Sequence, residues 1–117
     1  MSITENLKYL DIARVAKDTD ATIYWLFYSL FTIVKQYIEQ IGKHSNSYFE
    51  TEQIFESLMQ DTPFIQQDLL HQLRLMNTFV EQKTKTYSWN QVETFIAPTQ
   101  NAINIIEKLI KNHHPEN

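Results

Sequence analysis

A line of polar side chains on one predicted helix is the part of this chain best suited to chemistry. Its members recur at spacings of three or four residues, which places them on one helix face: Gln67, His71, Arg74, Thr78, Glu81 and Lys85. An arginine on such a face can hold a phosphate, and a histidine one turn away can titrate near neutral pH. A solvated helix face shows the same pattern and is its more common origin. The candidate ligand-binding residues are Arg74, His71, Asn77 and Glu81.

Catalytic and metal-binding motifs are otherwise scarce. None of the four histidines forms the His-Glu-x-x-His pair of zinc proteases, and His113-His114 near the chain end is more typical of a frayed tail than of a metal site. The chain has no cysteine, no Gly-x-Ser-x-Gly elbow and no phosphate-binding loop. We therefore expect no metal and no cofactor, and a binding role in preference to a hydrolase or kinase activity.

The length and composition indicate one all-α domain spanning residues 1–117. Only one glycine, Gly42, and three prolines occur, which leaves little room for the turns of a sheet. The net charge of −4 argues against nucleic acid as a partner, and the nearest approach to a basic patch is Lys83 with Lys85. The first 20 residues lack the apolar stretch of a signal peptide, and the absence of cysteine suits a reducing cytoplasm, so we expect a cytoplasmic protein.

The most apolar segment is residues 23–34, which contain five aromatic side chains. It is too short to span a bilayer, which needs about 20 apolar residues. A helix that is apolar nearly all round must be covered on most sides, so the segment predicts the central helix of a bundle. Because a small domain cannot cover every face of such a helix, we also expect part of it to contact a partner chain. The predicted interface residues are Tyr24, Phe27, Tyr28, Phe31, Leu75 and Phe79.

Capping signals and apolar spacing divide the chain into a four- or five-helix up-and-down bundle. The predicted helices span about residues 3–17, 21–41, 48–60, 63–83 and 89–112. Ser2–Glu5, Ser47–Glu50 and Ser88–Gln91 read as capping boxes, residues 18–20 supply cap oxygens, and Gly42 is a left-handed end. In the third helix we expect an inward face made of Phe49, Ile54, Phe55, Leu58 and Met59. The last helix keeps its apolar phase through Pro98, so we expect one kinked helix there.

Three segments in this order resemble the HEPN domains that accompany nucleotidyltransferases. Residues 24–31, Tyr-Trp-Leu-Phe-Tyr-Ser-Leu-Phe, resemble the YYAxF-type helix of that family. Residues 43–45, Lys-His-Ser, resemble its short Thr-His-Ser turn, and residues 73–79 resemble its Leu-Arg-x-x-Ala-Asp-Tyr segment. The similarity covers about residues 20–112. It implies a helical bundle that is usually a homodimer, acting either as a metal-independent RNase or as a partner subunit of a small nucleotidyltransferase, often in a toxin–antitoxin module.

The RNase motif of that family is incomplete in this chain. The family arginine matches Arg74, but the next position should be polar and is Leu75. The family histidine should follow within residues 79–81, and no histidine occurs after Arg74 until His113. Glu81 is a poor substitute, because the general acid or base should titrate near neutral pH.

The leading hypothesis is accordingly a non-catalytic, dimeric HEPN-like subunit that binds a nucleotidyltransferase or another protein, with Arg74 anchoring a phosphate or acidic group. One alternative is a HEPN-type RNase with a displaced active site that uses His71 and Arg74 in reversed order. Another is a stand-alone helical interaction module that holds a partner helix in an aromatic groove.

Overall fold

The computed structural model of the chain describes residues 3–60, 63–82 and 87–112, and the side chains of all of these except 59 and 63–68. The described residues form five helices and no strand: α1 (Ile3–Val15), α2 (Thr19–Gln40), α3 (Tyr48–Met59), α4 (Pro63–Glu81) and α5 (Trp89–Asn112). The all-α bundle predicted from the sequence is confirmed, and its helix boundaries lie within about two residues of those expected. Of the residues singled out above, Ser2, Lys83, Lys85, His113 and His114 lie outside the described residues, as do the side chains of Met59 and Gln67.

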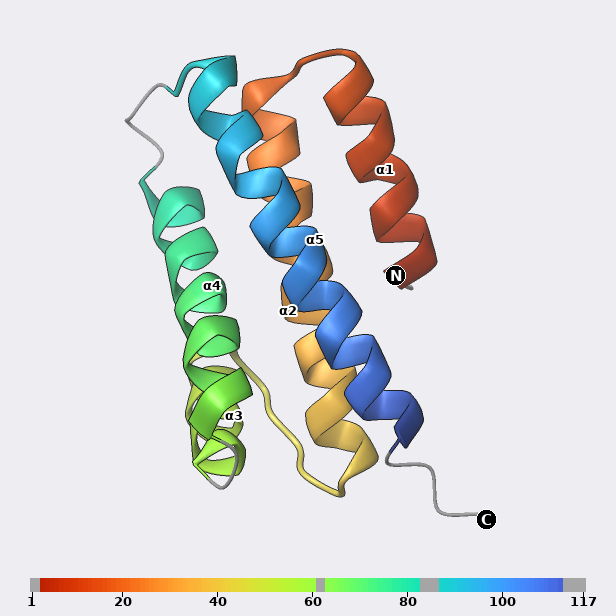
Figure 1. The fold of residues 1–117 in the computed structure, drawn as a ribbon, viewed down its shortest axis with the longest axis vertical. Helices are drawn as coiled ribbons and strands as arrows, with labels where there is room; N and C mark the ends of the chain where they lie inside the picture. The colour runs from red at the N-terminus through yellow and green to blue at the C-terminus, as the bar shows by residue number, and fades with distance from the viewer. Residues whose placement is uncertain (1–2, 61–62, 83–86, 113–117) are drawn as a thin grey trace.

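Helix α2 is the central element of the bundle, as its composition predicts. It packs against α1, α3, α4 and α5. Figure 1 shows α5 crossing in front of α2, with α1 on one side and α4, running in the opposite direction to α2, on the other. Helix α3 lies beside the first part of α4 and is much shorter than α2 or α4. Helix α3 therefore packs beside α2 and α4 over only part of their length.

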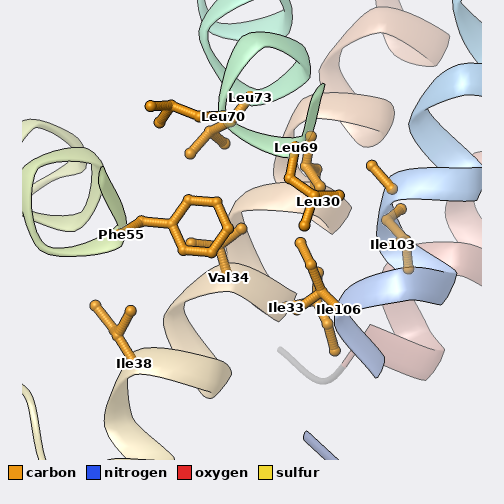
Figure 2. Packing of buried hydrophobic residues seen from close by; sticks show 11 residues of the cluster. Leu30, Ile33, Val34, Ile38, Phe55, Leu69, Leu70, Leu73, Ile103 and Ile106 are labelled. Carbon is orange, nitrogen blue, oxygen red and sulfur yellow. The ribbon is translucent and has the colours of Figure 1, made fainter. Parts of the chain in front are cut away.

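The core is built around apolar residues of α2 at helical spacing. Leu30, Val34 and Ile38 follow one another at intervals of four and are fully buried. Phe55 of α3 is also fully buried, and Figure 2 shows its ring extending from α3 toward Val34 of α2. Helices α4 and α5 complete this cluster with Leu69, Leu70, Leu73, Ile103 and Ile106. Removing a buried phenylalanine side chain of this kind costs about 3 to 5 kcal/mol.

A second apolar cluster attaches α1 to α2, α4 and α5. It contains Leu10 of α1, Ile23 and Leu26 of α2, Met76 of α4, and Val92 and Ile96 of α5. A side-chain bond from Asn6 Nδ2 to Thr32 Oγ1, at 3.0 Å, also joins α1 to α2. The first helix is thus held by both apolar packing and a partly buried polar contact.

The helix ends follow the predicted capping chemistry. The Asp18 side chain accepts a hydrogen bond from the Ala21 N–H at 3.1 Å and caps α2. Gly42 has φ +88°, and the bond from Lys43 N to Ile38 O at 2.9 Å completes a Schellman motif after α2. Ser88 and Gln91 cap α5 reciprocally, since each backbone N–H donates to the side-chain oxygen of the other residue. Helix α5 continues past Pro98 as a single helix, as expected.

Two sequence predictions about α3 are wrong in detail. Phe49 was expected in the core but is 67% exposed, because it precedes the buried Phe55 by six residues and so lies about 120° away around the helix. The expected reciprocal capping box is also shifted. Ser47 Oγ accepts from the Glu50 N–H at 3.1 Å, but the Glu50 carboxylate accepts from Asn46 N at 2.7 Å and not from Ser47.

Candidate functional site

Arg74, the residue expected to anchor a phosphate, forms ion pairs with two carboxylates of α3. Its Nε donates to Glu52 Oε2 at 2.9 Å, and its NH2 group lies 3.3 Å from Glu56 Oε2. These contacts, above all the hydrogen bond to Glu52, raise the pKa of the Arg74 guanidinium above its ordinary value. The Arg74 side chain thus joins α4 to α3, and any phosphate would have to compete with two carboxylates for it.

Tyr48 extends this polar network at the beginning of α3. Its hydroxyl donates to the other oxygen of the Glu52 carboxylate, Oε1, at 2.7 Å. Burial raises the pKa of the Tyr48 phenol far above its ordinary value, and the hydrogen bond to Glu52 raises it further. Glu52 therefore accepts from a neutral phenol on one oxygen and from a guanidinium on the other, an arrangement that satisfies the carboxylate and fixes α3 against α4.

The other predicted ligand-binding residues do not converge with Arg74. Asn77 Nδ2 donates to Glu81 Oε1 at 2.9 Å, so these two residues form a pair of their own along α4. His71 is exposed, and among the described residues it has no hydrogen-bonding or ionic partner. The four side chains line neither of the two pockets described below. The four candidate ligand-binding residues therefore separate into an ion-paired arginine, an amide–carboxylate pair and a solvent-exposed histidine.

The predicted aromatic interface has a clearer counterpart in the structure. Tyr9 stacks on Trp25 with ring centroids 4.9 Å apart, Tyr24 meets the edge of Trp25 at 5.0 Å, and Tyr24 stacks on Tyr28 at 5.6 Å. We refer to Tyr9, Tyr24, Trp25 and Tyr28 as the aromatic ladder. Tyr9 is 41% exposed and Tyr24 is 44% exposed, whereas Trp25 and Tyr28 are half-buried, so the ladder forms a partly open surface across α1 and α2.

The remaining predicted interface residues divide among other surroundings. Phe27 and Phe31 stack at 5.8 Å and pack with Tyr48 against the core, so they are only partly accessible. Phe79 packs against Phe95 at 4.4 Å. Leu75, two positions after the buried Leu73 of α4, is half-buried. The six residues therefore do not form one continuous surface, and Tyr24 and Tyr28 are the two that belong to the ladder.

A pocket of about 410 Å³ opens beside the ladder, between the beginning of α2 and the end of α4. Three aromatic rings line it, those of Tyr24, Phe79 and Tyr87, together with Ile23, Val80, Gln82 and Asp20. Phe79 meets the edge of the Tyr87 ring at 5.0 Å, and the Tyr87 hydroxyl donates to Gln82 Oε1 at 2.8 Å. We refer to this cavity as the three-ring pocket.

A second pocket, of about 720 Å³, lies between the end of α1 and the first half of α5. Its lining mixes charges of both signs with apolar residues: Asp11, Arg14, Val15, Lys17, Trp89, Glu93, Ile96, Ala97 and Gln100. Arg14 and Asp11 lie 3.6 Å apart within it. This mixture gives no preference for one ligand chemistry.

The sequence analysis missed Tyr9 and Trp25 in the ladder and Asp20 and Tyr87 in the three-ring pocket. Each joins a neighbour from a different segment of the chain, and helical periodicity reports only neighbours within one helix. Asp20 had been recognised, but only as a cap. The sequence offered one indication of these two residues: Asp20 begins a predicted helix and Tyr87 lies just before another, and helix ends are common places for binding residues.

Comparison with known proteins found no family model that matches the chain, no matching curated protein and no matching solved structure. Within the described part of the chain, no three His, Cys, Asp or Glu residues gather where they could hold a metal ion. None of the helices, over the residues searched, is long and apolar enough to cross a membrane.

Proposed function

We propose that this protein is a non-catalytic, HEPN-like binding subunit that forms a homodimer through the aromatic ladder. The observation that carries the proposal is the exposure of linked aromatic rings on α1 and α2. Tyrosine and tryptophan are enriched at protein interfaces because they offer a large apolar area and a polar tip at a small entropic cost. Rings already stacked on one another are also ordered before a partner arrives, which lowers the cost of association.

A second copy of the chain is the occupant that this surface fits best. All four side chains of the ladder are uncharged, and three of them carry a phenol hydroxyl. In a two-fold symmetric interface the same patch meets itself, so a charged patch would bring like charges together, whereas a neutral one does not. Phenol hydroxyls can both donate and accept, and so they can pair across such an axis.

Two features support the HEPN-like part of the proposal. The two segments that resemble the family motifs, on α2 and α4, belong to long helices that pack against each other in opposite directions (Figure 1). Arg74 is ion-paired within the chain, which suits a subunit that does not cleave RNA. On this proposal the further partner is a small nucleotidyltransferase, as in a toxin–antitoxin module, or another cytoplasmic protein.

Light scattering on the purified chain tests the dimer. We expect a mass of twice the 13.9 kDa of one chain, and the double variant Tyr24→Ser/Tyr28→Ser should give a monomer with unchanged helix content. The matched control is Phe49→Ser, which removes an exposed aromatic ring of α3 outside the ladder. A monomeric native protein would overturn the proposal, as would a double variant that dimerises as well as the native chain.

The nucleotidyltransferase partner is tested separately. The tagged chain is recovered from its native host, the captured proteins are identified by mass spectrometry, and binding is then repeated with the purified pair. A purified nucleotidyltransferase that binds the chain supports the HEPN-like reading. A stable dimer that binds no such enzyme supports a stand-alone interaction module.

The RNase alternative receives less support from the geometry. The described contacts of Arg74 occupy its guanidinium with two carboxylates, and His71 is exposed on α4 without a described partner to orient it. RNA cleavage by the purified chain that disappears in His71→Ala would nevertheless restore that alternative.

A further inference from the structure

The geometry points to the three-ring pocket as a binding site for a small organic cation, an alkylammonium or guanidinium group. Three aromatic rings from different segments, Tyr24 of α2, Phe79 of α4 and Tyr87 ahead of α5, line one cavity with the carboxylate of Asp20. Ring faces carry negative electrostatic potential and attract cations, and groups of aromatic rings recognise quaternary ammonium ligands in this way. The inference concerns a different site from the dimer surface, although Tyr24 belongs to both.

Among the described residues that line the pocket, the charges favour a cation over an anion. Asp20 is exposed and, among the described residues, has neither a hydrogen-bonding nor an ionic partner, so its charge is available to a ligand. The oxygen of the Gln82 side chain is already engaged by the Tyr87 hydroxyl. The positive end of α2 opposes a cation with roughly half a unit charge, and the carboxylates of Asp18 and Asp20 outweigh it.

The apolar part of the lining favours an alkylated or planar cation over a bare metal ion. Ile23 and Val80 offer only hydrocarbon, and one carboxylate is too few ligands for a hard cation, which takes six or more oxygens. A volume of about 410 Å³ lies at the lower end of the range for small-molecule sites. A ligand of the size of choline or of an arginine side chain fits within this volume and suits the lining.

The test uses two probes of the same shape and different charge on the full-length chain. Choline is titrated against its uncharged isostere 3,3-dimethylbutan-1-ol, and binding is followed by the NMR shifts of the Ile23 and Val80 methyl groups. We expect choline to bind about tenfold more tightly than the isostere. Equal affinities would show a pocket that selects only apolar bulk and would overturn the inference.

Variants locate the site and separate it from the dimer. Asp20→Asn should lower choline affinity about fivefold or more while the mass in solution stays that of the native chain. Asp11→Asn, which removes a carboxylate from the second pocket, is the matched control and should leave the affinity unchanged. An Asp20→Asn variant that binds choline as well as the native chain would overturn the site, whatever the oligomeric state proves to be.

N-acetylarginine amide, as a further probe, identifies the source of the cation. Methyl shifts with this probe and not with choline would assign the pocket to an arginine side chain of a partner protein, and the Asp20→Asn comparison would then be made with this probe in place of choline. The reverse result would assign the pocket to a free alkylammonium compound. Both results retain the organic cation as the ligand. Shifts with neither probe would refute it.

Discussion

Gln72 of α4 donates its Nε2–H to Thr99 Oγ1 of α5 at 2.8 Å, and both side chains are buried, with 8% and 0% exposure. Thr99 directly follows Pro98, which cannot supply a helical N–H, so this bond joins α4 to the part of α5 where backbone bonding is interrupted. A buried amide left without a partner destabilises the folded protein by more than the net stabilisation that the hydrogen bond provides. The contact therefore matters mainly through what its loss would leave unpaired.

Thr99→Val should lower the free energy of unfolding by about 1 to 3 kcal/mol, because the Gln72 amide would remain buried without its acceptor. Denaturant unfolding followed by circular dichroism measures the change. The double variant Gln72→Leu/Thr99→Val removes both polar groups and should recover most of the loss. A double variant less stable than Thr99→Val would contradict this account.

The ion pair between Arg74 and Glu52 should contribute stability and not ligand affinity. Both side chains are accessible to water to some degree, 44% and 17%, so we expect a coupling of about 0.5 to 1 kcal/mol in a double-mutant cycle of Arg74→Met and Glu52→Gln. Phosphate or RNA added to the native chain should not raise its melting temperature. A melting temperature that rises with phosphate in the native chain and not in Arg74→Met would show that Arg74 binds an anion after all.

The helices could be predicted from the sequence because their signals are local. Asp18 lies three residues from the N–H that it caps, and Gly42 ends α2 through bonds that span a single turn. The central place of α2 also followed from its composition, since a helix that is apolar on most sides can only be stable when covered. Phe49 was misplaced although its spacing argued against an inward position: Tyr48, seven residues before the buried Phe55, shares its helix face, whereas Phe49 does not.

The candidate sites could not be predicted in the same way because their partners are distant in the chain. Arg74 appeared to belong with His71 on a single helix face, yet its carboxylate partner Glu52 lies 22 residues earlier on another helix. Asp20 and Tyr87 line one pocket only because the beginning of α2 lies near the residues that precede α5. Periodicity identifies which residues share a face, whereas tertiary packing decides what that face meets.

Tyr48 should make the stability depend on pH in the alkaline range. An unfolded tyrosine ionises near pH 10, whereas the raised pKa of Tyr48 keeps its proton on in the folded chain. The stabilisation from this group is therefore complete below about pH 10 and is lost as the pH rises further, because the unfolded chain releases a proton that the folded chain retains.

Tyr48→Phe tests this dependence. The variant should lose about 1 kcal/mol at pH 7, where the bond to Glu52 is removed, and its unfolding free energy should fall less steeply than that of the native chain above about pH 10. Urea unfolding at a series of pH values from 7 to about 11 provides both quantities. Parallel curves for the two proteins would mean that Tyr48 ionises equally in the folded and unfolded chains.

Lys17 and Gly42 both end a helix in the left-handed conformation. Introducing glycine at the first position should raise the stability, and removing it from the second should lower the stability. Lys17 has φ +55° and closes α1 with bonds from Lys17 N to Arg14 O and from Asp18 N to Ala13 O, both 3.0 Å, the same motif that Gly42 forms after α2. A side chain makes the left-handed conformation unfavourable, whereas glycine adopts it freely at the cost of a more flexible unfolded chain. Lys17→Gly should therefore stabilise the protein by about 0.5 to 1 kcal/mol.

Gly42→Ala should destabilise the protein by about 1 kcal/mol for the converse reason. An added Cβ at Gly42 would meet no atom within 4 Å, so the loss reports backbone strain alone and not a steric clash. Lys17→Ala controls for the loss of the lysine side chain, since it keeps the Cβ and should gain nothing. Thermal unfolding compares the stabilities of the three variants directly. Equal stabilisation by Lys17→Gly and Lys17→Ala would show that the lysine side chain, and not its backbone conformation, is the unfavourable feature.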